Sequence, residues 1–122
     1  MGNEIKVNEF IRTKYGEIAK VIEYKDEIVF DKEIKFYGMY ISYICEDELD
    51  FIVKHSSNLI DLIQCGDYVN GKQVSNVDKI DNINFIEWTD GDMYKTEIEN
   101  DKFIKTIVTK EMMESVSYKV KE

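Results

Sequence analysis

The amino-acid sequence predicts a mostly β protein: a small closed or rolled antiparallel sheet, of the SH3-like or a similar small-barrel type, with two short helices. Runs of β-branched and aromatic residues recur at short intervals between Gly, Asn and Asp. Asn70-Gly71 is the dipeptide that most strongly predicts a two-residue hairpin. Eight to ten short strands with only two helical turns are typical of a small barrel.

The first half of the chain supplies four candidate strands. Phe10–Tyr15 and Glu17–Tyr24 are expected to pair across a tight turn, and Ile28–Phe30 is a short strand. Ile34–Ile44 is predicted to be the longest strand. Apolar or aromatic residues occupy both of its faces, which is typical of a strand at the centre of a closed sheet or of one that meets a partner.

A short strand, a capped helix and a hairpin are predicted in the middle of the chain. Leu49–Val53 is the strand. The helix of about two turns is expected over Leu59–Ile63, with Ser56 or Ser57 as its N-cap. A helix this short is not stable alone, so we expect it to cover one end of the sheet. Two short strands, 67–69 and 72–74, then face each other across the Asn-Gly turn.

The second half repeats this β pattern. Three strands are expected in it, at Ile83–Trp88, Met93–Glu99 and Phe103–Val108. Turns at Asp90-Gly91 and Asn100-Asp101 separate them. Thr109 is suited to cap a short turn over Lys110–Glu114, and the alternation of apolar and polar residues predicts a final strand over Val116–Lys121.

Length and composition predict one domain, spanning residues 1–122. A chain with 43% hydrophobic and 12% aromatic residues is typical of a globular protein, so its 34% of charged residues does not indicate disorder. It has no run of about 18 apolar residues and no apolar N-terminal stretch of the signal-peptide type. We therefore expect a cytoplasmic protein with no membrane partner.

The charge balance disfavours direct binding to nucleic acid. Twenty-five acidic residues against 16 basic ones give a net charge of −9, and Arg12 is the single arginine. A phosphate backbone requires a basic stripe, which scattered lysines do not form. Two interpretations of the acidity stay open. It serves solubility, or an acidic face occupies a basic groove that normally holds DNA or RNA.

No catalytic or cofactor-binding signature stands out, so we expect a non-enzymatic protein without a cofactor. Cys45 and Cys65 form no C-x-x-C pair, and with His55 as the only histidine they match no common zinc framework. Asp90-x-Asp92 and Glu97-x-Glu99 have too few ligands for a calcium loop and are more typical of a hairpin tip and a solvated strand face.

The candidate binding surface combines aromatic side chains with acidic residues close in sequence. Tyr and Trp are enriched in interface hot spots because they bury a large area and keep a polar group. Packing in the core is the alternative for each aromatic residue. The candidate binding residues are Tyr37, Tyr40, Tyr43, Glu46, Asp47, Glu48, Asp50 and Trp88.

The segment from His55 to Gly71, with Ile11–Gly16 before it and Ile107–Glu111 after it, resembles small proteins of phages and prophages of low-GC Gram-positive bacteria. Abundant Ile, Lys and Asn, with no proline, are also typical of an AT-rich coding sequence. The resemblance covers most of the chain. It implies a phage accessory protein, and small acidic proteins of this class often inhibit host defence.

Three functions follow from these observations. The first is an anti-defence protein, similar to an anti-CRISPR, which binds a bacterial immune effector in the host cytoplasm and blocks a nucleic-acid-binding groove with an acidic face. The second is a sponge that sequesters a nucleotide immune signal at a subunit interface, with Arg12 and a few lysines as phosphate partners. The third is a virion structural or assembly protein, which would form homo-oligomers. The first is favoured.

Overall fold

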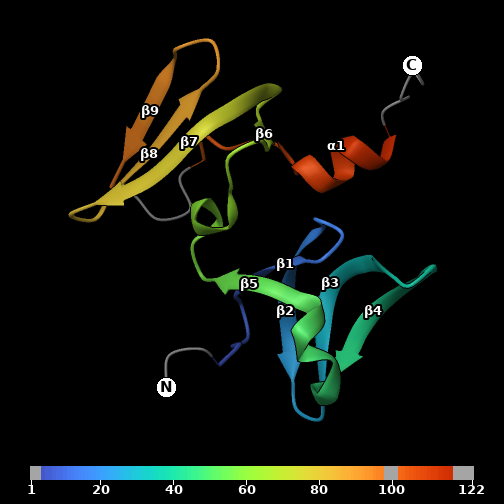
Figure 1. Cartoon of the computed structure of the whole chain (residues 1–122). Helices are drawn as coiled ribbons and strands as arrows, with labels where there is room; N and C mark the ends of the chain where they lie inside the picture. The colour runs from blue at the N-terminus through green and yellow to red at the C-terminus, as the bar shows by residue number, and fades with distance from the viewer. Residues whose placement is uncertain (1–3, 98–101, 117–122) are drawn as a thin grey trace, which may run out of the picture. The chain divides into compact units, whose positions relative to one another are not determined.

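The computed structural model describes residues 4–97 and 102–116 of the chain (Figure 1). The described residues form a mostly β fold with two five-stranded antiparallel sheets and short helices, which confirms the mostly β, antiparallel part of the predicted class. The closed or rolled sheet stays a prediction. The chain divides into two compact units, unit 1 over Met1–Leu62 and unit 2 over Ile63–Glu122. The single domain over residues 1–122 stays a prediction.

Unit 1 contains a sheet in the order β4-β3-β2-β1-β5, in which β4 and β5 are the edge strands (Figure 1). Its strands are β1 (Phe10–Thr13), β2 (Ile18–Tyr24), β3 (Glu27–Phe36), β4 (Met39–Cys45) and β5 (Ile52–Ser56). Two 3-10 helices complete the unit: η1 (Glu46–Phe51) between β4 and β5, and η2 (Leu59–Leu62) after β5.

The core of unit 1 forms from the apolar residues on one side of these strands. Ile28 and Ile44 are register partners on β3 and β4, and both are fully buried. Ile11 on β1 lies opposite Ala19 on β2. Each fully buried isoleucine stabilises the fold by roughly 1.5–3 kcal/mol. Arg12, the next residue of β1, is also fully buried, and it donates a hydrogen bond from Nη1 to the carbonyl oxygen of Leu62, at 2.9 Å.

The predicted long strand over Ile34–Ile44 is wrong, because a hairpin turn interrupts it. Tyr37 and Gly38 both have positive φ, at 47° and 88°, which is typical of the type I′ turn that joins two strands with the least splay. Phe36 pairs with Met39 across this turn. The predicted short strand at 28–30 is the first part of β3. Residues assigned to two faces of one strand therefore lie on two neighbouring strands.

The predicted elements after β4 are shifted. Residues 46–51 form η1, so the strand expected over Leu49–Val53 begins only at Ile52. The expected helix of about two turns is shorter: η2 is a 3-10 helix over Leu59–Leu62, the short form in which 3-10 helices are usual. The predicted N-cap at Ser56 or Ser57 is displaced, because Asn58 directly precedes η2 and its carbonyl oxygen accepts the first bond, from the Asp61 N–H at 3.0 Å. Ser56 instead stabilises the turn before the helix: its Oγ accepts a hydrogen bond from the Asn58 N–H at 3.1 Å and donates one to Asp61 Oδ2 at 2.7 Å.

Unit 2 contains a sheet in the order β10-β6-β7-β8-β9. Its strands are β6 (Tyr68–Val69), β7 (Lys72–Ile80), β8 (Ile83–Trp88), β9 (Met93–Thr96) and β10 (Ile107–Val108). They are followed by α1 (Lys110–Val116), where Thr109 Oγ1 accepts a hydrogen bond from the Met112 N–H at 3.3 Å. The predicted cap at Thr109 is therefore confirmed.

The hairpins of unit 2 confirm one prediction and extend another. Asn70 and Gly71 have φ of 53° and 86° and join β6 to β7 as predicted. A second turn, at Asp81 and Asn82 with φ of 50° and 70°, was not predicted, so β7 runs past Val74 to Ile80. Asn and Asp tolerate positive φ better than other non-glycine residues do.

The predicted strands near the C-terminus are shorter than expected or fall outside the described residues. The strand expected over Phe103–Val108 is confined to Ile107–Val108, and the one expected over Met93–Glu99 ends at Thr96 in the described part. Val116 ends α1 and does not begin a strand. The turn at 100–101 and residues 117–121 of the final strand lie outside the described residues.

Asp67 organises the centre of unit 2. Its side chain is fully buried. Oδ1 accepts a hydrogen bond from the Lys110 N–H at 2.9 Å, and Oδ2 accepts one from the Gln64 N–H at 2.7 Å. Backbone donors of this kind stabilise a buried carboxylate. Asp67 therefore joins the start of α1 to the segment before β6.

We expect Gly38→Ala to lower the free energy of unfolding by roughly 1–2 kcal/mol, because an L residue at positive φ is strained. A Cβ added at Gly38 meets no atom within 4 Å, so the loss reports backbone conformation and not a clash. Urea denaturation measures it. Gly38→Asn is the matched control with a smaller expected loss, and equal stability of all three proteins would contradict the type I′ turn.

Candidate functional site

Seven of the eight predicted binding residues lie in unit 1, around the β3–β4 hairpin and η1. Tyr37 occupies the hairpin turn, and Tyr40 and Tyr43 lie on β4. Their exposed fractions are 62%, 66% and 46%. The four acidic residues belong to η1, which begins directly after β4. The structure therefore brings the tyrosines and the carboxylates to neighbouring elements. We call these seven residues the tyrosine–acid surface.

Contacts at both ends hold η1 in place. At its start, Glu48 Oε1 accepts a hydrogen bond from the Cys45 N–H at 2.8 Å. At its end, Phe51 is 2% exposed and packs edge to face on Phe36, with 4.7 Å between ring centroids. Acidic residues in a first turn also interact favourably with the helix dipole. Asp47 and Asp50 are left exposed to solvent.

Tyr37 is both exposed and packed. Its ring contacts Phe36, Phe51 and Tyr15, at centroid distances of 4.7, 5.6 and 6.1 Å. Aromatic pairs at such distances contribute roughly 0.5–1.5 kcal/mol beyond the area that they bury. These contacts hold the ring in one orientation, although most of it faces solvent.

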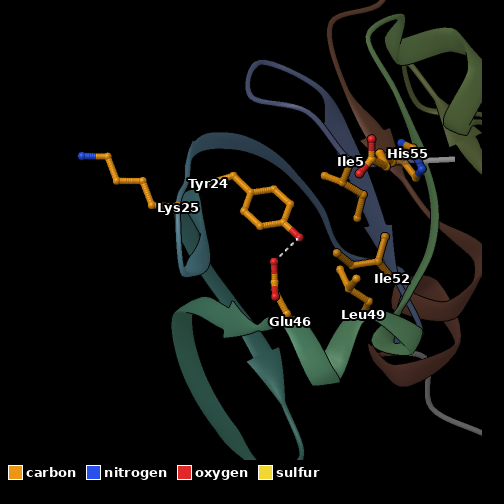
Figure 2. Close-up of a pocket in the computed structure, with 8 residues that line it drawn as sticks. Ile5, Tyr24, Lys25, Glu46, Leu49, Ile52 and His55 are labelled. Carbon is orange, nitrogen blue, oxygen red and sulfur yellow. Dashed lines mark hydrogen bonds between the residues drawn. The ribbon is translucent and has the colours of Figure 1, made fainter. Parts of the chain in front are cut away.

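A pocket of about 620 Å³ lies next to the tyrosine–acid surface and shares Glu46 with it (Figure 2). Eight residues line it: Glu4, Ile5, Tyr24, Lys25, Glu46, Leu49, Ile52 and His55. The Tyr24 hydroxyl donates a hydrogen bond to Glu46 Oε1 at 3.1 Å. Sequence analysis identified only Glu46, because the lining comes from segments that are far apart in the chain.

The pocket is electrostatically negative at the Tyr24 hydroxyl. Partial burial, the hydrogen bond to Glu46 and the charges of Glu46 and Glu4 together raise the pKa of Tyr24 above its usual 10.0. Lys25 extends away from the other lining side chains (Figure 2). His55 Nδ1 lies 2.9 Å from Glu9 Oε1, so a carboxylate already engages that atom.

Cys45, Asp47 and Glu48 place their ligand atoms within 4.8 Å of one another. A thiolate and carboxylates are suitable ligands for zinc. Desolvation and the nearby carboxylates of Glu48 and Asp47 raise the pKa of the Cys45 thiol, which keeps it protonated at neutral pH. Glu48 Oε1 is also engaged by a backbone N–H. The protonated thiol and the engaged Glu48 oxygen both weaken this cluster as a metal site.

Trp88 belongs to unit 2 and is 4% exposed. Its Nε1 donates a hydrogen bond to the carbonyl oxygen of Val69 at 3.3 Å, and Lys72 Nζ lies 4.9 Å from the centroid of its ring. The structure places this side chain in the core of unit 2. Core packing is the alternative to a binding role that the sequence leaves open for each aromatic candidate. Its role in binding stays a prediction.

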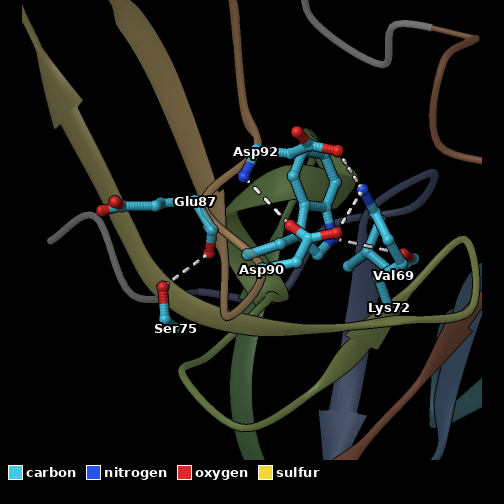
Figure 3. A network of polar contacts seen from close by, with 7 residues as sticks. Val69, Lys72, Ser75, Glu87, Asp90 and Asp92 are labelled. Carbon is cyan, nitrogen blue, oxygen red and sulfur yellow. Dashed lines mark hydrogen bonds and ion pairs between the residues drawn. The ribbon is translucent and has the colours of Figure 1, made fainter.

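Besides lying over the Trp88 ring, Lys72 contacts Asp90 and Asp92 at the predicted hairpin tip, as Figure 3 shows. Its Nζ forms ion pairs with Asp90 Oδ2, at 3.0 Å, and with Asp92. The Asp92 N–H donates to Asp90 Oδ1 at 3.0 Å, and this bond together with Lys72 lowers the pKa of Asp90. Asp90-x-Asp92 thus forms a local ion-pair network at a hairpin tip.

No family model, curated protein or solved structure matches this chain. The resemblance to phage and prophage proteins therefore stays a prediction. Within residues 4–97 and 102–116, no helix has the length and apolar character that crossing a bilayer requires.

We expect Glu46→Gln to lower the pKa of Tyr24 toward 10.0, because it removes a charge that opposes ionisation. A pKa that is raised in the folded state stabilises the protein below pH 10, and this contribution is lost as the pH rises through the folded pKa. NMR titration of the Tyr24 ring carbon measures it. Asp47→Asn is the control, and an equal shift in both variants would contradict the Tyr24–Glu46 contact.

Proposed function

We propose that this chain is a non-enzymatic phage anti-defence protein that binds a bacterial immune effector in the host cytoplasm. Its tyrosine–acid surface blocks a groove that normally holds nucleic acid. The observation that carries the proposal is the exposure of Asp47 and Asp50 on η1, next to the exposed tyrosines of β4. A nucleic-acid groove is basic, so a cluster of carboxylates complements it and accelerates encounter.

The tyrosines supply binding free energy that the charges alone do not provide. Exposed charge pairs contribute little free energy, typically below about 1 kcal/mol each. Tyr40 and Tyr43 offer area to bury and a hydroxyl to hydrogen-bond, as interface hot spots do. The contacts of Tyr37 with Phe36 and Phe51 reduce the entropy lost on binding.

The alternative of a nucleotide sponge has less support. Arg12, the only arginine, is fully buried and donates a hydrogen bond to the Leu62 carbonyl. The carboxylates of Glu46 and Glu4 line the pocket of unit 1, and their negative charges act on the Tyr24 hydroxyl. They would repel a phosphate. Neither feature provides the basic site that a nucleotide requires.

We further propose that the sheet of unit 1 rolls toward a small barrel of the SH3-like type. The support is the irregular register of β3: Ile34 pairs with Ile41 and Val29 with Tyr43, so β3 contains extra residues between these pairs. A bulge of this kind bends its strand and increases the local twist. Strand-to-strand distances in solution, from nuclear Overhauser effects between β4 and β5, test the closure.

We expect the double variant Asp47→Lys/Asp50→Lys to lose inhibition, because it replaces carboxylates of η1 with cations that a basic groove repels. The matched control is Asp78→Lys/Glu97→Lys, in unit 2. Each substitution changes the charge by +2, so both variants move the net charge from −9 to −5.

The readout is the plating efficiency of a phage on a host that carries a CRISPR nuclease matched to that phage. The wild-type protein and the control restore plating, and the η1 variant restores it at least about tenfold less. Equal activity of the two variants would contradict the assignment to η1. No restoration by the folded wild-type protein would contradict inhibition of this effector class.

A further inference from the structure

The pocket of unit 1 offers three kinds of surface to a ligand. Ile5, Leu49 and Ile52 form an apolar side, as Figure 2 shows. Tyr24 contributes an aromatic ring whose hydroxyl points toward Glu46. The carboxylates of Glu46 and Glu4 supply negative charge, and both act on the same hydroxyl. This combination suits a cation that has an apolar stem.

The cationic residues of the lining do not cancel this charge. Lys25 extends away from the other side chains, and His55 Nδ1 is engaged by Glu9 at 2.9 Å. Glu46 accepts the Tyr24 hydrogen bond on Oε1, and a carboxylate can accept further bonds on both oxygens. An anionic ligand would meet two carboxylates and is disfavoured.

We propose that this pocket receives an arginine side chain of the partner protein. The methylene stem packs on Leu49 and Ile52, the guanidinium lies against the ring of Tyr24, and Glu46 accepts its N–H bonds. The inference rests on the proposed function, since it names the group that the partner contributes. Arginine is frequent in grooves that bind phosphate backbones, so a blocked groove presents such a side chain.

Arginine fits the pocket better than lysine for two reasons. Its planar guanidinium stacks on an aromatic ring and donates two parallel hydrogen bonds to a carboxylate, whereas an ammonium is a compact, strongly hydrated charge. Tyr24 and Glu46 provide this ring and this carboxylate. The preference for arginine therefore distinguishes a shaped pocket from general attraction to a protein of net charge −9.

The test titrates the full chain with two capped pentapeptides, Ala-Ala-Arg-Ala-Ala and Ala-Ala-Lys-Ala-Ala, and follows backbone amides by NMR. We expect chemical-shift changes at the amides of the pocket residues Tyr24, Glu46, Leu49 and Ile52. We also expect the arginine peptide to bind at least about threefold more tightly than the lysine peptide. Equal binding of the two peptides, or shifts confined to unit 2, would overturn the proposal.

Variants separate the roles of charge and ring. Glu46→Gln should weaken binding of the arginine peptide about tenfold, since hydrogen bonds to a charged acceptor are the strong ones. Asp78→Asn removes the same charge from unit 2 and should leave binding unchanged. Tyr24→Phe keeps the ring and the preference for arginine, whereas Tyr24→Leu should abolish that preference. An equal loss in Glu46→Gln and Asp78→Asn would overturn the pocket.

Failure of this inference is distinguishable from failure of the proposed function. The η1 variant used in the plating assay changes Asp47 and Asp50 and leaves the pocket residues intact. If plating is restored and the peptides bind equally, inhibition stands and the arginine pocket is wrong. If the arginine peptide binds in the pocket and plating is not restored, arginine binding by the pocket is supported and inhibition of a CRISPR nuclease is contradicted.

Discussion

The tyrosine–acid surface depends on one hydrogen bond, from the Cys45 N–H to Glu48 Oε1 at 2.8 Å. It turns the chain from the end of β4 into η1. Burial of Phe51 then holds the far end of η1 against the aromatic residues of the hairpin. Between these two points the remaining acidic residues have no place in the core, so they face solvent or the pocket. The Glu48 carboxylate, which is bonded to the backbone, thus helps to position the exposed carboxylates of Asp47 and Asp50.

The β3–β4 hairpin supplies the second constraint. With positive φ at Tyr37 and Gly38, the chain reverses so that Ile34 and Ile41 become neighbours. The reversal keeps Ile34, Ile41 and Ile44 with the core and leaves Met39, Tyr40 and Tyr43 exposed along an edge strand. Natural edge strands often carry lysine or proline, which discourages pairing with other chains. β4 has neither, and an interaction role of this edge is consistent with its exposed tyrosines.

Features of the fold that depend on neighbouring residues can be predicted from the sequence. Asn70-Gly71 predicts its turn because that dipeptide adopts positive φ at both positions, and Thr109 predicts its cap because a hydroxyl precedes the helical turn. The sequence does not predict the Tyr37-Gly38 turn, because tyrosine at positive φ is rare and is typical of a strand. The pocket was missed because Ile5, Tyr24 and Ile52 meet only when three distant segments fold together.

We propose that unit 1 binds its partner through β4 and η1. Hydrogen–deuterium exchange of the full chain, alone and in the presence of the proposed immune effector, tests this proposal directly. We predict that protection on binding concentrates in residues 37–51, where the exposed tyrosines and carboxylates lie. Protection confined to β7, β8 and β9 of unit 2, with unchanged exchange in β4 and η1, would contradict it.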